Sequence, residues 1–235
     1  MLFNINNEDI EKPHKTSLKR HIRELFWKVW WRSPWCSIKR HRLERKARES
    51  FDYEKNKDIS IIAVNCIGGE LYSILGLKFT SPLINSSLKR DDFVLMATNF
   101  EAYMKGHLDR FFYNSTDDLC CYLVPEGDLP PVVISWPHDH DKQIVIDNFN
   151  KRRARINYDK LVFITDSDGL SDDSYELFRQ VKGFKKVILT HASNPRTDDF
   201  IEKLNVDSAV GLQYKKLSGI FRFQEIWDFV SWFNK

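Results

Sequence analysis

Two acidic residues lie at the end of the apolar run 160–166: Asp166 is its last residue, and Asp168 follows with one residue between them. Carboxylate oxygens are ligands that Mg²⁺ and Mn²⁺ prefer, and such a cation neutralises the diphosphate that leaves a nucleotide-sugar donor. One large class of nucleotide-sugar transferases holds its metal with Asp-x-Asp after a buried strand. The spacing therefore predicts a Mg²⁺ or Mn²⁺ site. The alternative is a turn that caps a helix beginning near Ser171.

A second cluster, His138, Asp139 and His140, follows the apolar run 132–137. Imidazole and carboxylate groups are common general acids and bases near neutral pH, and they also bind metals. We expect one of these three side chains to deprotonate an acceptor hydroxyl. The alternative is that all three are solvated residues of a surface loop.

The third cluster lies at the end of the apolar run 59–66, where Asn65 and Cys66 precede Gly68 and Gly69. Glycines between a strand and a helix let backbone N–H groups approach a phosphate at the helix N-terminus. These four residues are predicted to bind donor phosphate. A weaker alternative makes Cys66 the nucleophile of a hydrolase or acyltransferase, and the simplest interpretation is a small buried residue beside a tight turn.

Three further cationic groups, Arg152, Arg155 and His191, are candidates for binding phosphate. Arg152 and Arg155 belong to the basic block 151–155, and guanidinium groups bind phosphate with two parallel hydrogen bonds. A solvated helix face explains the block equally well. His191 lies near the end of the apolar run 185–192 and precedes Asn-Pro-Arg, which is typical of a turn.

These clusters require a sheet that brings strand ends together. From residue 59 onward, apolar runs of strand length alternate with amphipathic segments, as in a layered α/β/α domain with a mainly parallel, or mixed, sheet. Ligands in such folds bind beyond the carboxyl ends of the strands. The predicted strands are 59–66, 82–86, 121–126, 132–137, 160–166, 185–192 and 209–212. The predicted helices are 70–78, 90–104, 141–153, 171–181 and 223–233.

Charge divides the chain near residue 50. Of the net +3, residues 1–11 carry −3 and residues 12–48 carry +11, which leaves −5 for residues 49–235. We therefore expect a basic helical N-terminal arm, 1–50, followed by one α/β domain, 51–235.

The arm combines cations with an apolar helical face and four tryptophans between positions 27 and 35. A helix is predicted from residue 18 until Pro34 ends it, and an exposed basic helix is predicted after the proline. Residues 16–48 are suited to an anionic membrane surface. Packing on the domain or on another subunit is the main alternative. Nucleic acid is not the expected partner, because no nucleic-acid-binding module follows the arm.

Composition excludes several classes of protein. No apolar run approaches the roughly 20 residues that a membrane-spanning helix needs, and the first residues lack the apolar core of a secretory signal peptide. Four cysteines are too few and too irregular for a disulfide framework or a zinc site. A reducing, cytoplasmic location is therefore expected.

Three segments, 59–85, 131–143 and 150–169, together resemble a bacterial family, the domain of unknown function 1919, associated with exopolysaccharide or capsular-polysaccharide biosynthesis. The resemblance covers about residues 55–215 and is carried by residues 65–66, 68–69, 81–82, 152–153 and 155–157. It implies a cytoplasmic protein of surface-polysaccharide assembly, but it supplies no chemistry.

Taken together, the clusters predict a glycosyltransferase-type enzyme at the inner face of the membrane. Its substrates would be a nucleotide-sugar donor and a lipid-linked or glycan acceptor. The alternative is a non-catalytic accessory or scaffold protein of the same pathway, which the lack of a strong catalytic signature favours.

Overall fold

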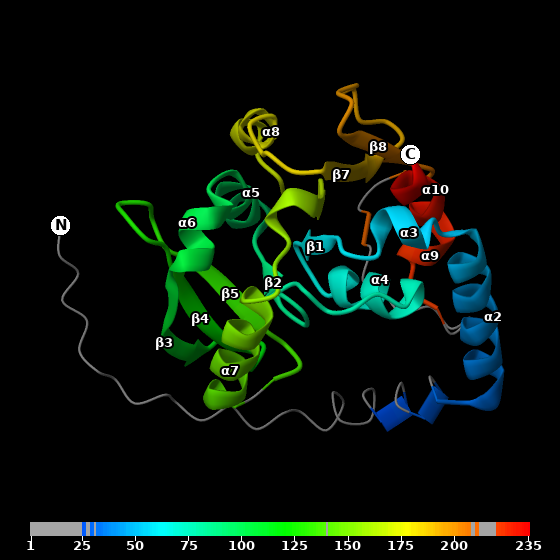
Figure 1. Cartoon of the computed structure of the whole chain (residues 1–235), viewed down its shortest axis with the longest axis horizontal. Coiled ribbons are helices and arrows are strands. Elements are labelled where there is room, and N and C mark those ends of the chain that lie inside the picture. Colours follow the sequence, from blue (N-terminus) through cyan, green and yellow to red (C-terminus); the bar gives the residue numbers. More distant parts are fainter. Residues whose placement is uncertain (1–24, 27–28, 31, 140, 208–209, 212–219) are drawn as a thin grey trace.

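Two four-stranded sheets organise the computed structural model, which describes residues 25–26, 29–30, 32–139, 141–207, 210–211 and 220–235 (Figure 1). The parallel sheet has the order β1-β6-β7-β8 and consists of β1 (Ser60–Ala63), β6 (Leu161–Asp166), β7 (Lys185–His191) and β8 (Ile201–Leu204). The antiparallel sheet has the order β2-β5-β4-β3 and consists of β2 (Ser87–Leu88), β5 (Val132–Trp136), β4 (Leu119–Val124) and β3 (His107–Tyr113).

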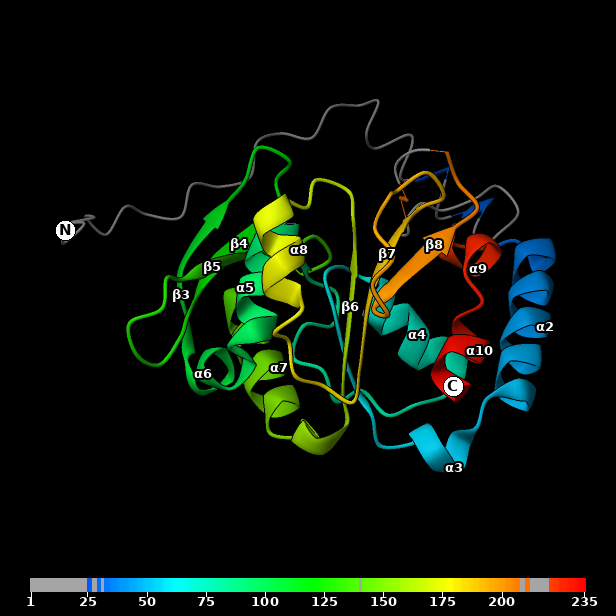
Figure 2. The ribbon, with the colours of Figure 1, turned by 90° about the horizontal axis from the view of Figure 1, so that it is seen from above.

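Helices cover both faces of the parallel sheet. They are α2 (Pro34–Ser50), α3 (Tyr53–Asn56), α4 (Ile67–Leu75), α5 (Arg90–Thr98), α6 (Phe100–Lys105), α7 (Lys142–Arg153), the 3₁₀ helix η1 (Tyr158–Lys160), α8 (Asp172–Phe178), α9 (Phe223–Ile226) and α10 (Phe229–Asn234). Figure 2 shows α5, α7 and α8 between the two sheets, and α4, α10 and α2 beyond the other face of the parallel sheet. Helix α5 contacts both β5 and β6, so it joins the two sheets.

Successive residues of the central strands enter two separate apolar clusters. Ile62 and Phe163 belong to the cluster that faces the antiparallel sheet, whereas Ile61 and Val162 belong to the cluster beneath α4. Because both faces of these strands are covered, their sequences are continuous apolar runs without polar alternation.

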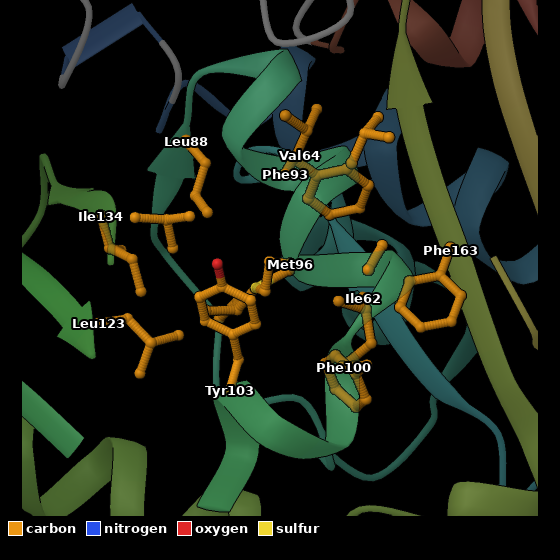
Figure 3. Packing of buried hydrophobic residues seen from close by; sticks show 14 of the residues in the cluster. Ile62, Val64, Leu88, Phe93, Met96, Phe100, Tyr103, Leu123, Ile134 and Phe163 are labelled. Carbon is orange, nitrogen blue, oxygen red and sulfur yellow. The ribbon is translucent and has the colours of Figure 1, made fainter. Parts of the chain in front are cut away.

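Figure 3 shows how the first cluster connects the two sheets. Met96 of α5 and Tyr103 of α6 lie between Ile62 of the parallel sheet and Leu123 of the antiparallel sheet. The Tyr103 hydroxyl satisfies its hydrogen-bonding capacity by donating to the Pro130 carbonyl at 2.6 Å. The parallel sheet is thus packed against the antiparallel sheet through one shared core.

The structure confirms the predicted mixed α/β class and its parallel sheet. It differs in giving the runs 121–126 and 132–137 to a second, antiparallel sheet. Residues 82–85 form turns rather than an edge strand, and the predicted terminal helix is two helices, because Asp228 caps α10 separately. Residues 209 and 212 of the predicted strand 209–212 lie outside the described residues.

Strand β3 was not predicted, because its sequence lacks regular alternation. Arg110 has a φ of 45°, and the register with β4 shifts between Asp109 and Phe112. Such a bulge places an extra residue in the strand and breaks the two-residue period on which strand prediction depends. The short β8 was also missed.

Helix α2 begins at Pro34 itself, where the sequence predicted the end of one helix and, after the proline, a second, exposed helix. Ser33 is the N-cap and accepts a hydrogen bond from the Cys36 amide at 3.4 Å. Proline is favoured at the first helical position, because its missing N–H would have no partner there. The basic helix predicted after Pro34 is present and packs against α4. Arg48 donates to the Ser73 and Ile74 carbonyls, both at 2.8 Å.

Before α2, the helix predicted from residue 18 falls largely outside the described residues. Residues 25–26 and 29–30 are helical. Within the described chain, no helix combines the length and the apolar character needed to cross a membrane.

Candidate functional site

The carboxyl end of β1 leads directly into α4 through Asn65 and Cys66. Asn65 is buried, and its side-chain oxygen accepts a hydrogen bond from the Ile67 amide at 3.0 Å. Its amide nitrogen lies 3.5 Å from an Asp166 carboxylate oxygen at the end of β6. Asn65 therefore fixes the first turn of α4 and connects the ends of two neighbouring strands.

The two glycines of α4 permit close packing of its first turn. A Cβ on Gly68 would lie 3.1 Å from the Cβ of Ala63, and one on Gly69 would lie 3.4 Å from Ile84. Close packing around α4 therefore accounts for a glycine at each position. Their predicted part in binding phosphate stays a prediction.

A cavity of about 1090 Å³ opens beside this turn. Its walls come from the start of α4, the segment that leads into α5, the ends of β3, β4 and β5, and Phe221. The cavity therefore lies between the carboxyl end of the parallel sheet and the antiparallel sheet. Of the predicted site residues, it brings together Asn65, Cys66 and His138.

Side chains of both charges line the cavity. Lys89 and Arg90 supply positive charge, and Glu70 and Asp118 supply negative charge. His138 is exposed in the turn after β5. Asp139, its neighbour, is half-buried and is not among the lining residues, whereas His140 lies outside the described residues. Of the three residues predicted to act as a base, His138 lines the cavity, and its role as a base stays a prediction.

Arg90 makes a two-pronged ion pair with Asp166. The guanidinium Nε and Nη2 donate to the two carboxylate oxygens at 2.9 and 3.0 Å. The Asp168 amide donates to the same carboxylate at 3.1 Å. Burial raises the pKa of Asp166, and Arg90 opposes that shift. Asp166 therefore holds Arg90 at the cavity wall.

Asp168 holds a different segment. Its two carboxylate oxygens accept hydrogen bonds from the Val210 and Gly211 amides at 2.8 and 2.9 Å. Both oxygens of Asp166 and both of Asp168 thus already have partners. The described part of the chain contains no cluster of three His, Cys, Asp or Glu residues suited to a metal, and this finding does not test the pair Asp166 and Asp168. The Mg²⁺ or Mn²⁺ site stays a prediction.

Replacement of Asp168 tests its role. We expect Asp168→Ala to lower the free energy of unfolding by about 1–3 kcal/mol, because two backbone N–H groups lose their acceptor. Asp168→Asn should lower it less, because an acceptor oxygen remains. Asp128→Ala, at an exposed loop position, is the control and should change it by about 0.5 kcal/mol or less. A rise in melting temperature with Mn²⁺ that Asp168→Asn abolishes would establish the metal site instead.

The remaining predicted phosphate ligands lie outside the cavity wall. Arg152 is half-buried, and its guanidinium donates to the Ile84 carbonyl at 3.4 Å. Burial lowers the pKa of Arg152, and Asp139 opposes that shift. Arg155 is exposed after α7. His191 ends β7, two strands away from β1, and its Nδ1 lies 2.9 Å from the Ser193 hydroxyl.

Residues 37–234 match the model of a protein family described as a domain of unknown function (DUF1919). That match spans most of the chain, including most of α2, both sheets and the cavity. The chain belongs to the DUF1919 family. A relative in Haemophilus influenzae, an uncharacterized protein, is 27% identical over 184 residues, which are 76% of this chain and 85% of the relative.

These comparisons correct the resemblance drawn from the sequence. The DUF1919 family is described as having unknown function, and the relative is uncharacterized. The assignment of the chain to an exopolysaccharide or capsular-polysaccharide biosynthesis family was therefore wrong.

Sequence reasoning missed several residues of the DUF1919 cavity. The sequence predicts only that Arg90 begins a helix, although it pairs with Asp166 across 76 positions of sequence. Asn114 and Ser135 come from β-strand ends that were not expected to face the parallel sheet. No local pattern marks them, because their place depends on how the two sheets pack.

Proposed function

We propose that this DUF1919 domain is a glycosyltransferase-type enzyme that binds a nucleotide-sugar donor in the cavity between the two sheets. The single observation that carries the proposal is the cavity of about 1090 Å³ at the carboxyl end of β1. Small-molecule sites typically occupy about 300–1,000 Å³ and favour this edge of a parallel sheet. The size of the cavity suits a donor and part of an acceptor.

The lining residues suit the parts of such a donor. Lys89 and Arg90 provide positive charge for a diphosphate, close to the segment that leads into α5. Phe112 and Phe221 provide rings against which a base can stack. His138 is the candidate base for an acceptor hydroxyl.

A cytoplasmic location is part of the same proposal. Support comes from the four cysteines, all of which are thiols rather than disulfides. The acceptor class, a lipid-linked or free glycan, stays a prediction. So does a place in surface-polysaccharide assembly, for which the comparisons offer no support.

Calorimetric titration with a panel of nucleoside-diphosphate sugars tests the proposal. We expect one of them to bind, and Lys89→Gln to weaken its binding about tenfold, because one charge-assisted contact to phosphate is lost. His138→Gln should keep the binding and lower turnover by about 10²–10⁴-fold. Lys182→Gln and His107→Gln, both at exposed positions outside the cavity wall, should change neither quantity.

Failure of the whole panel to bind would overturn the transferase proposal. Binding of a nucleotide sugar without any turnover, at an affinity that His138→Gln leaves unchanged, would favour the non-catalytic accessory protein. That alternative has support in the structure, because Asp166 and Asp168 are occupied with contacts inside the protein.

One further candidate activity has a specific observation in its favour. Cys66 and His138 line the same cavity, and Cys66 is the N-cap of the nine-residue α4. A thiol and an imidazole in one cavity suit acyl transfer or hydrolysis through a covalent thioester. Loss of turnover in Cys66→Ser, together with retained ligand binding, would select this activity over glycosyl transfer.

A further inference from the structure

Exposed apolar side chains gather in one short part of the chain. The described residues include eleven exposed large hydrophobic side chains, and six of them lie between positions 25 and 38. Trp35 is 73% exposed, Val29 67% and Leu25 64%. Exposed apolar side chains that gather in one segment are typical of a site of interaction.

Helix α2, which follows these residues in the chain, has an exposed face of its own. Trp35, Ile38, Arg42 and Arg45 are exposed and follow one another at intervals of three or four residues, which places them on one side of the helix. The opposite side contains the buried Cys36 and packs against α4. The exposed side is therefore the one that remains available to a partner.

The charge of α2 indicates the kind of partner. Its 17 residues include six Lys or Arg and two Glu. One of the acids, Glu49, lies at the far end of the helix and within 3.6 Å of Arg45. The apolar end of the surface is thus followed by a cationic end. Apolar side chains and tryptophan beside cations are typical of helices that lie in the headgroup region of an anionic bilayer.

We propose that this arm surface docks the protein onto an anionic lipid bilayer. The arm surface consists of Leu25, Phe26, Val29, Trp30 and the α2 face Trp35, Ile38, Arg42 and Arg45. Trp35 and Ile38 enter the headgroup boundary, and Arg42 and Arg45 contact lipid phosphates. The proposal does not depend on the transferase proposal, because it uses none of the cavity residues.

Two other partners explain the surface less well. Nucleic acid would use the cations, but phosphate contacts leave six exposed apolar side chains without a role. A second copy of the chain would bring two cationic faces together, and like charges across an interface are costly. Anionic lipid satisfies both the apolar and the cationic parts.

Co-sedimentation of the full chain with vesicles tests the proposal. We expect binding to vesicles of phosphatidylglycerol and phosphatidylcholine at low salt, and weak binding to phosphatidylcholine alone. Ile38→Ser should weaken binding about tenfold, because an apolar group no longer leaves water. The matched control is Ile144→Ser on α7, since Ile144 is 50% exposed and Ile38 is 53% exposed. It should bind as the wild type does.

A double variant that removes two positive charges tests the contribution of the cations on the arm surface. Arg42→Gln with Arg45→Gln should weaken binding about 25-fold at low salt, at about fivefold for each cation near an anionic surface. Lys182→Gln with Lys203→Gln removes the same charge from exposed positions elsewhere and should have little effect. Unchanged circular dichroism and melting temperature would show that each variant is folded.

Several results would overturn the proposal. Failure of the folded full chain to bind anionic vesicles at low salt would do so, as would equal binding to neutral vesicles. Binding to duplex DNA without binding to vesicles would identify nucleic acid as the partner. A dimer in light scattering that Ile38→Ser dissociates, again without vesicle binding, would identify a second copy.

Discussion

Replacing Arg90 by Met is expected to lower the free energy of unfolding by about 3–5 kcal/mol at neutral pH, as the loss of one partner of a buried ion pair usually does. Asp166 is fully buried and receives both of its charged hydrogen bonds from Arg90. Without Arg90 it must either stay ionised in an apolar surrounding or take up a proton. Urea denaturation of the wild type and the variant measures the difference.

The difference should depend on pH. Burial already raises the pKa of Asp166 against the opposing effect of Arg90, so the pKa should rise further in Arg90→Met. A carboxyl whose pKa is raised in the folded state contributes stability at low pH, and that contribution is lost as pH rises through the folded pKa. The deficit of the variant should therefore be largest at neutral pH and should shrink as the solution is acidified.

An exposed ion pair provides the control. Lys105 and Glu101 form an i,i+4 pair at 2.8 Å, with side chains 55% and 70% exposed. Glu101→Gln should cost about 0.5 kcal/mol or less. If Arg90→Met cost no more than this, or if its deficit were the same at every pH, Asp166 would not depend on Arg90 for its charge.

The fold class could be predicted because its signal is local. The runs 59–66, 160–166 and 185–192 are continuously apolar, since β1, β6 and β7 are covered on both faces. The separation into two sheets could not be predicted in this way. The local sequence pattern of β4 and β5 is the same whether they extend the parallel sheet or pair with each other, as they do. Their separation from the parallel sheet depends on the packing of α5 and α6 between the two sheets (Figure 3).

The candidate site could be predicted only in part, for the same reason. Asn65, Cys66 and His138 were found because each follows a strand, and strand ends meet at one edge of the fold. The partners of Asp166 and Asp168 were not found, because Arg90 and the 210–211 segment lie far away in sequence. A short acidic motif looks the same whether it binds a metal or ties two segments together.

Arg90 connects stability with the proposed ligand site. Its side chain joins the start of α5 to the end of β6, and it also lines the cavity. A donor phosphate would therefore meet a guanidinium that Asp166 already orients. Lys89 is therefore a better position than Arg90 for a binding test, because replacing Lys89 leaves the buried pair of Arg90 and Asp166 intact.

Gly106→Ala is expected to have a comparably large effect, about 3 kcal/mol or more in the free energy of unfolding. Gly106 lies between α6 and β3, where a Cβ would be 1.9 Å from the Val124 carbonyl oxygen and 2.9 Å from the Cα of Pro125. Both obstacles are backbone atoms at the end of β4, which cannot move without shifting the β3–β4 pair. Thermal and urea denaturation measure the loss.

Gly127→Ala is the matched control for the glycine. Gly127 has a φ of +87°, and no atom lies within 4 Å of a Cβ built there. Gly127→Ala therefore loses only the preference of glycine for a positive φ, which lowers the free energy of unfolding by about 1 kcal/mol. A Gly106 variant as stable as the Gly127 variant would contradict the close approach of α6 to β4. Because the far ends of β3 and β4 line the cavity, a displaced β3–β4 pair should also weaken donor binding, whereas Gly127→Ala should leave it unchanged.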